Sequence, residues 1–371
     1  MLPISLTHAL NTFYKSQYPL IQPLSVPFSM EVEPGHRLPS VADAFLLLNH
    51  ADEIGEEARN YVDFVATMAQ KFRHVEAWYN TNVRISSEVE HEGAKDRPAG
   101  WAGFGSLPLA LMFYCAVKDG TPGDYIECGV FKGGSLACMS HVCDYLGLSA
   151  IAADTFEGLP SDSETGYYRK GQFEGRLTEV QGYVAKCGKP DCVIWKQGLF
   201  SDTLSSLPNQ VALAFVDTDL YESSVSALSA LKMSPGSIIA SDGVGWSDFL
   251  DGELQAWSEE GKAVQDCLSG APFLGLWTGN GHMSLFKKRV SGDRLLYSTA
   301  FLHYITHRFF FPEEYSQLLV SLRRDAGRVL GRSNVTESDV LEFAFSEALE
   351  QLYRLSYMIG GLRWQISQLQ V

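Results

Sequence analysis

The sequence is short of positive charge. It contains 29 Lys and Arg residues against 44 Asp and Glu residues, which gives a formal net charge of −15. Proteins that bind nucleic acids or anionic membranes use clustered Lys and Arg side chains, and the sequence has no such cluster. We therefore expect neither nucleic acid nor membrane as a partner, and a small-molecule substrate instead.

Long apolar runs and paired cysteines are also missing. The longest apolar stretch, residues 107–117, is too short to span a bilayer. Residues 1–30 lack the basic start and apolar run of a signal peptide. The seven cysteines form no Cys-x-x-Cys pair, and a chain of this size does not need disulfides. We expect free thiols and a cytoplasmic protein.

The first part of the chain, residues 1–119, is predicted to be an irregular and helical extension. Prolines at positions 3, 19, 23 and 27 interrupt any periodicity and predict an irregular segment up to about residue 30. Apolar residues at three- and four-residue steps then predict helix within 40–72. Residues 105–117 are typical of a buried helix.

Short β-rich runs alternate with helical stretches in the middle part, residues 120–290. The runs are 124–128, 150–154, 192–196, 211–217, 237–242, 273–277 and 283–287. This alternation predicts an α/β fold with a mostly parallel seven-stranded sheet and helices on both faces. Only the turn-forming residues 278–281 separate the last two runs, so we expect an antiparallel hairpin at one edge.

The last part, residues 291–371, shows only helical patterns. Helices are expected over 294–311 and 313–330, and Thr336-x-x-Asp339 resembles a capping box that would begin a further helix through Tyr357. Nothing in this part is typical of a catalytic site. Because apolar helix faces need a partner surface, we expect a packing module and a homodimer.

The turn after the first predicted strand carries the first functional signal. Residues 126–135 read Ile-Glu-Cys-Gly-Val-Phe-Lys-Gly-Gly-Ser, so a strand ends, a glycine-rich turn follows and a helix begins. Glycines let the backbone approach a ligand, and the helix start offers free N–H groups. The spacing differs from the dinucleotide fingerprint and favours a smaller nucleoside ligand. A purely structural turn would also explain these glycines.

Carboxylates and aromatic residues follow the next strands. Asp154 lies 25 residues beyond Gly129, where a carboxylate commonly binds ribose hydroxyls. Gly198 and Phe200 follow the third strand and would lie beside an adenine. The remaining carboxylates, after the fourth and fifth strands, are Asp217, Asp219 and Asp242.

These residues all fall at the carboxyl ends of consecutive strands, which face the crevice where α/β proteins bind ligands. Asp217 or Asp219 is a candidate general base, metal ligand or amine anchor. The order of the signals along the chain is that of an S-adenosylmethionine (SAM) site.

Four blocks resemble the macrocin O-methyltransferase family in the same order: residues 123–134, 154–160, 198–204 and 216–223. The resemblance covers about residues 120–285 and implies a class I methyltransferase, Rossmann-like fold that binds SAM. The cofactor contacts that it implies are Glu127, Gly129, Phe131, Gly133, Gly134, Ser135, Asp154, Thr155, Phe156, Gly198, Phe200 and Asp217.

In that family, a magnesium ion helps a sugar hydroxyl to lose its proton. Its ligands come from the Asp-x-Asp block, here Asp217 and Asp219, and from paired acids after the fifth strand. The second position reads Ser241-Asp242, so one carboxylate of the pair is missing. With fewer hard oxygen ligands, magnesium affinity is expected to fall, and any metal ligands would be Asp217, Asp219 and Asp242.

Three functional hypotheses follow. The first is methyl transfer to a hydroxyl or amine of a small natural-product metabolite, with Asp217 as the base and residues 160–173 as a lid that includes Tyr168. The second is acceptor-free SAM chemistry: a SAM lyase, or cyclisation to azetidine-2-carboxylate and methylthioadenosine. That reaction needs a dry aromatic wall, for which the candidates are Tyr168, Phe173, Tyr221 and Trp246. The third is a non-catalytic SAM-binding protein. The catalytic candidates are Asp217, Tyr168 and Tyr221.

Overall fold

The computed structural model describes residues 2–18, 41–85, 97–98, 102–205, 207, 210–243, 249–250, 253–254, 258–268, 273–277, 284–288 and 299–344. Within these residues, no helix is both long enough and apolar enough to cross a membrane.

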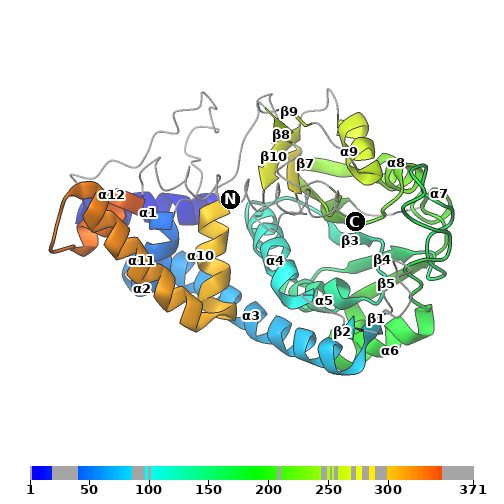
Figure 1. Ribbon diagram of the computed structural model, residues 1–371, viewed down its shortest axis with the longest axis horizontal. Helices are drawn as coiled ribbons and strands as arrows, with labels where there is room; N and C mark the ends of the chain where they lie inside the picture. Colours follow the sequence, from blue (N-terminus) through cyan, green and yellow to red (C-terminus); the bar gives the residue numbers. More distant parts are fainter. Residues whose placement is uncertain are drawn as a thin grey trace.

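A seven-stranded sheet forms the core of the part of the molecule seen at the right of Figure 1. Its strands are β3 (Asp124–Cys128), β4 (Ala150–Asp154), β5 (Val193–Gln197), β6 (Val211–Val216), β7 (Met233–Ser241), β10 (Phe273–Trp277) and β11 (Ser284–Lys288). The spatial order is β10-β11-β7-β6-β3-β4-β5, with β3 to β7 parallel and β11 antiparallel to both β7 and β10. This is the class I methyltransferase order, so the predicted fold and edge hairpin are confirmed.

The sheet is covered on both faces, and its central strands are buried throughout. Every residue of β3 and of β6 is buried. Side chains that point to opposite faces belong to separate cores: Tyr125 packs with α4 (Ala102–Lys118) and α5 (Gly134–Leu146), and Ile126 packs toward α7 (Phe200–Thr203) and α8 (Tyr221–Ala230). Helix α6 (Leu177–Cys187) lies beside α5, and α9 (Glu259–Leu268) beside α8.

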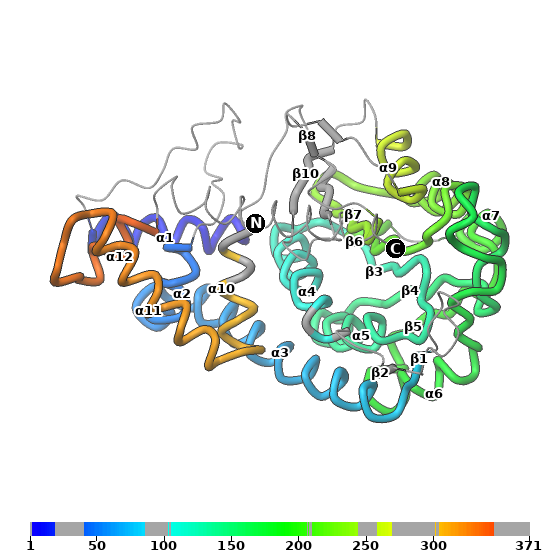
Figure 2. The backbone as a smooth tube through the Cα atoms, in the orientation of Figure 1, coloured from blue at the N-terminus to red at the C-terminus, as the bar shows by residue number. Residues whose placement is uncertain are grey.

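Helices from both ends of the chain form a lobe at one side of the sheet (Figures 1 and 2). They are α1 (Ile4–Gln17), α2 (Val41–Ile54), α10 (Thr299–Phe310), α11 (Pro312–Leu330) and α12 (Glu337–Ala344). The long helix α3 (Glu56–Asn82) runs from this lobe to α4 and α5, and so joins the lobe to the sheet (Figure 2). Domain boundaries at 119/120 and 290/291 stay a prediction.

The irregular N-terminus was wrongly predicted. Residues 4–17 form α1 because no proline lies inside this segment and Pro3 precedes its first turn, where proline is tolerated. Leu6, Leu10 and Phe13 recur at helical spacing and are buried. Prolines 19, 23 and 27 lie outside the described residues.

The capping box in front of α12 is confirmed. The backbone N–H of Thr336 donates to the Asp339 carboxylate (2.7 Å), and the N–H of Asp339 donates to the Thr336 hydroxyl (3.3 Å). The predicted continuation of this helix to Tyr357 lies outside the described residues.

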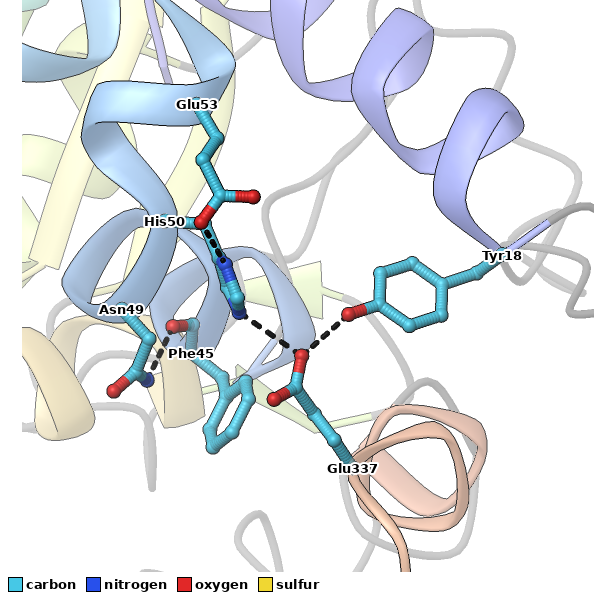
Figure 3. Close-up of polar contacts among 6 residues, drawn as sticks. All are labelled: Tyr18, Phe45, Asn49, His50, Glu53 and Glu337. Carbon is cyan, nitrogen blue, oxygen red and sulfur yellow. Dashed lines mark hydrogen bonds and ion pairs between the residues drawn. The ribbon is translucent and has the colours of Figure 1, made fainter.

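A polar cluster ties α12 to the two N-terminal helices (Figure 3). His50 of α2 contacts Glu53 through Nδ1 (3.0 Å) and Glu337 of α12 through Nε2 (2.9 Å). The hydroxyl of Tyr18, at the end of α1, donates to the same Glu337 oxygen. Burial lowers the pKa of His50, but the bonds and charges of Glu53 and Glu337 outweigh this and raise it. The two ends of the chain are therefore held together by charge-assisted contacts.

Candidate functional site

Two adjoining cavities lie at the carboxyl ends of the parallel strands. Their volumes are about 220 and 520 Å³. The smaller one is bounded by the glycine-rich turn and by α3 and α4, and the larger one reaches the ends of β4, β6 and β7. Both are lined by Gly129, Phe131, Asp217 and Ile85, so these four residues lie at the border between the two cavities.

The turn after β3 packs closely against the end of β6. Gly129 has a φ of +90°, and a Cβ atom added there would lie 1.7 Å from the carbonyl oxygen of Asp217. The N–H of Asp217 donates to the carbonyl of Cys128 at 2.9 Å. Only glycine fits at this position, and the close approach places Asp217 beside the turn. Gly133, Gly134 and Ser135 continue the lining of the smaller cavity.

Glu127 lies beneath the turn and is not among the residues that line either cavity. Its carboxylate is fully buried and accepts hydrogen bonds from the hydroxyls of Tyr125 and Ser135, both at 2.6 Å. Burial raises the pKa of Glu127 to about 7, although these hydrogen bonds oppose the shift. The geometry suits a residue that holds the turn and the start of α5.

Asp154 connects the end of β4 to the glycine-rich turn. Its carboxylate accepts the backbone N–H groups of Val130 (2.7 Å) and Phe131 (3.1 Å). Asp154 and Thr155 line the larger cavity, as do Gly198 and Phe200. Phe156 does not appear in the lining of either cavity: it is buried, with its ring 5.9 Å from that of Trp195.

Three aspartates face the larger cavity from the ends of β6 and β7: Asp217, Asp219 and Asp242. Burial raises the pKa of Asp219 and of Asp242 to about 7, and repulsion from Glu260 adds to both shifts. Burial and the charges of Asp242 and Asp219 raise the pKa of Asp217 well above its usual range. The described residues that line this cavity include no Lys, Arg or His, so no cation in this described lining opposes the shifts.

The segment expected to be a lid is folded on itself over the cavity. The N–H of Leu159 donates to the carbonyl of Gln172 (2.8 Å), and that of Gly171 donates to the carbonyl of Leu159 (2.9 Å). Tyr168 and Phe173 line the larger cavity, and the Tyr168 hydroxyl interacts with the Asp219 carboxylate. Burial and the nearby Asp219 raise the pKa of Tyr168, which keeps its hydroxyl protonated.

Comparison with known proteins agrees with this geometry. The family model for macrocin-O-methyltransferase (TylF) matches residues 46–252, more than half of the 371 residues. The chain belongs to the macrocin O-methyltransferase family. This confirms the resemblance found in the motifs, and with it the predicted SAM-dependent methyltransferase family.

The macrocin O-methyltransferase match starts inside α2, well before the first motif recognised in the sequence. Helices α3 and α4, which bound the smaller cavity, therefore belong to the family's common part.

Individual relatives are similar over parts of the chain. One relative is the 8-demethyl-8-(2,3-dimethoxy-alpha-L-rhamnosyl)-tetracenomycin-C 4'-O-methyltransferase of Streptomyces olivaceus. It is 34% identical to this chain over 36% of this chain and 59% of its own length. Demethyldecarbamoylnovobiocin O-methyltransferase from Streptomyces niveus is 27% identical over 53% of this chain and 84% of its own. The solved structure of the O-methyltransferase NovP is 20% identical, with a TM-score of 0.45, and the match covers 62% of this chain and 99% of that one.

Two further aromatic candidates for the site were Tyr221 and Trp246. Tyr221 was wrongly predicted to face the reacting groups: its hydroxyl donates to Asp266 of α9 at 2.9 Å, and the residue is absent from the lining of both cavities. It is the first residue of α8, so its side chain leaves the crevice. Trp246 lies outside the described residues.

The magnesium site implied by the macrocin O-methyltransferase family does not fit the described donor set. Within the described part of the chain, no group of three or more His, Cys, Asp or Glu side chains is arranged to hold a metal ion. Ser241 replaces one expected carboxylate, and its hydroxyl donates to Glu260 at 2.6 Å. The Asp219 carboxylate interacts with the Tyr168 hydroxyl.

Glu260 is the residue of this site that the sequence pattern did not indicate. It is 2% exposed and its carboxylate contacts the ends of both β6 and β7. It lies in α9, and the sequence before α9 does not show the strand-then-helix pattern that pointed to the other site residues. The only local signal was the Glu259-Glu260 pair at the start of a helix.

Proposed function

We propose that this protein transfers the methyl group of SAM to a hydroxyl group of a small natural-product metabolite. The observation that carries the proposal is the position of Asp217, which lines both cavities. One cavity contains the glycine-rich turn, and the other contains the acidic cluster. The named relatives, which are O-methyltransferases acting on natural products, support the same reaction class.

We assign SAM to the space between the glycine-rich turn and the ends of β4 and β5. Gly129 to Ser135 would hold the methionine end, Asp154 the ribose hydroxyls, and Gly198 with Phe200 the adenine. Bound SAM supplies a methyl group that is made electrophilic by its sulfonium. Glu127 would act indirectly, since Ser135 and Tyr125 occupy its carboxylate.

An acceptor hydroxyl must lose its proton as its oxygen becomes nucleophilic. Asp217 is the proposed proton acceptor, because it lies where the two cavities meet. Burial and repulsion from neighbouring carboxylates raise the pKa values of Asp217, Asp219 and Asp242, which makes each a stronger base when it is ionised. Tyr168 would orient Asp219, and Tyr168 and Phe173 would exclude water from the reacting groups.

The test is a panel of hydroxylated glycosides and phenols incubated with SAM, with products followed by mass spectrometry. We expect S-adenosylhomocysteine together with a monomethylated acceptor. Asp217→Asn should lower the rate by about 100-fold or more. The matched control is Asp191→Asn, an exposed aspartate next to β5, and it should keep the wild-type rate.

Two outcomes would overturn the proposal. Methylthioadenosine formed from SAM alone would show the acceptor-free chemistry, with azetidine-2-carboxylate identifying cyclisation. SAM that is bound but never consumed with any acceptor would indicate a non-catalytic binding protein. The homodimer and the cytoplasmic location stay predictions, and sedimentation of the purified chain tests the first of them.

A further inference from the structure

Glu260 joins the two strand ends that carry the acidic cluster. It is the second residue of α9, and its side chain is buried between the segments that follow β6 and β7. It is absent from the lining of both cavities. Any role in the reaction must therefore be exerted through other residues.

Each oxygen of the Glu260 carboxylate is committed to one strand end. Oε2 accepts the backbone N–H groups of Thr218 (2.7 Å) and Asp219 (3.1 Å), just after β6. Oε1 accepts the hydroxyl of Ser241 (2.6 Å) and the N–H of Gly243 (2.9 Å), at the end of β7. Four donors on one buried carboxylate satisfy it fully, and all four come from outside its own helix.

The backbone at Asp219 shows why this acceptor matters. Asp219 has a φ of +60°, the left-handed region that non-glycine residues adopt only when their surroundings hold them there. Its N–H is one of the groups bound by Glu260. In that conformation the N–H groups of Thr218 and Asp219 both point to one oxygen atom of Glu260. The side chains of Asp217 and Asp219 still line the cavity.

The start of α9 is itself fixed to the end of β7. The hydroxyl of Ser258 donates to the carbonyl of Gly243 (2.6 Å) and accepts the N–H of Gly261 (2.8 Å). A Cβ atom added at Gly243 would lie 2.6 Å from the Cβ of Glu260. Only a glycine allows this approach, so the carboxylate reaches both strand ends without freedom to shift.

We propose that Glu260 is a positioning residue for the acceptor side of the reaction, which fixes Asp217, Asp219 and Asp242 relative to one another. The expected effect of Glu260 on turnover rests on the proposed methyl transfer. Its role in holding the two strand ends does not. Among the contacts of the described residues, no hydrogen bond links Glu260 to the glycine-rich turn or to Asp154. Cofactor binding should therefore depend on Glu260 far less than turnover does.

The decisive variant is Glu260→Gln. A glutamine amide has one acceptor oxygen, and its NH₂ group would face backbone or hydroxyl donors, so one strand end would lose its acceptor. Asp266→Asn is the matched control: it lies in the same helix and is exposed, and its remaining oxygen can still accept the Tyr221 hydroxyl.

Two measurements on the full-length protein separate the parts of the proposal. Amide hydrogen exchange followed by mass spectrometry should be at least about 10-fold faster in Glu260→Gln for peptides spanning 217–219 and 241–243, and unchanged for 129–135. Calorimetry with S-adenosylhomocysteine should give an affinity within about threefold of wild type. With an acceptor found in the panel above, kcat should fall about 100-fold while KM for SAM stays nearly constant. Asp266→Asn should change none of these.

Several results would overturn the assignment. Wild-type exchange in both segments would show that Glu260 does not hold them. If residues 129–135 lost as much exchange protection as 217–219 and 241–243, Glu260 would have a general structural role. The same would follow if the affinity for S-adenosylhomocysteine fell as far as kcat. If Glu260→Gln does not fold, Ser241→Ala removes one donor and leaves the carboxylate, and faster exchange confined to 241–243 is then required. If the wild-type protein does not bind S-adenosylhomocysteine, the proposed function is contradicted. The role of Glu260 in holding the strand ends is then tested by the hydrogen-exchange measurement alone.

Discussion

The hydroxyl of Tyr168 faces the carboxylate of Asp219 and interacts with it. This contact joins the folded segment above the larger cavity to the acidic cluster at its base. Tyr168 therefore has two roles in the proposed reaction: it lines the space for the acceptor, and it stabilises the ionised form of Asp219. The Tyr168 hydroxyl lowers the pKa of Asp219, against the larger raising effects of burial and Glu260.

Replacing Tyr168 by Phe should move the pH dependence of turnover. Without the hydroxyl, the pKa of Asp219 rises further above about 7, so its ionised form is reached only at higher pH. The acidic limb of the pH–rate profile should shift to higher pH, with slower turnover at pH 7 that recovers in more alkaline buffer. Tyr167→Phe is the control, because Tyr167 is 62% exposed. An unshifted profile in Tyr168→Phe would remove Asp219 from the titration that limits the rate.

Gly129→Ala should destabilise the domain strongly. The added Cβ would lie 1.7 Å from the Asp217 carbonyl oxygen at a φ of +90°. We expect a loss of about 2–4 kcal/mol in the free energy of unfolding, from overpacking and from left-handed strain. Gly147→Ala isolates the strain, because Gly147 has a φ of +69° and open space around its Cβ position; it should cost about 1–2 kcal/mol. Urea unfolding measures both, and equal losses would contradict the packing argument.

Asp154→Ala should weaken S-adenosylhomocysteine binding. The substitution removes the acceptor of the Val130 and Phe131 N–H groups, and it removes the carboxylate proposed to hold the ribose. A decrease of about 10- to 100-fold in calorimetric affinity is expected from the loss of hydrogen bonds to a charged group. Asp144→Ala, an exposed aspartate paired with Lys189, should bind as wild type does. Unchanged affinity in Asp154→Ala would exclude the assigned ribose site.

The helical lobe should lose stability as the pH rises. The pKa of His50 is raised in the folded state, so its protonation stabilises the fold fully below the unfolded pKa of about 6.5. This contribution disappears as the pH passes through the folded value. Because Glu53 and Glu337 are largely exposed, the effect should be about 1 kcal/mol or less.

Thermal unfolding of wild type and His50→Gln between pH 5.5 and 8.5 measures this effect. The difference between the two proteins should shrink toward high pH, whereas His8→Gln, an exposed histidine, should track wild type. A difference that stays constant with pH would contradict the linkage.

Local patterns were enough to predict the sheet and several residues that line the two cavities. Gly129 and Asp217 directly follow buried strands, Asp154 is the last residue of its strand, and the carboxyl ends of parallel strands meet at one edge. Tyr221 follows the same pattern but begins a helix, and helix geometry directs its side chain to Asp266. Glu260 contacts residues 17 to 42 positions away, and no local spacing reveals such a contact. Helix α1 was missed because prolines beside a segment were read as prolines within it.

The most direct test of the central claim uses SAM labelled with ¹³C in its methyl group. The protein is incubated with this SAM and the acceptor panel, and the products are assigned by NMR. We expect the labelled carbon to appear on an acceptor oxygen in wild type and in Asp191→Asn, but not in Asp217→Asn. Label recovered only in methylthioadenosine, formed without any acceptor, would contradict methyl transfer as the function of this site.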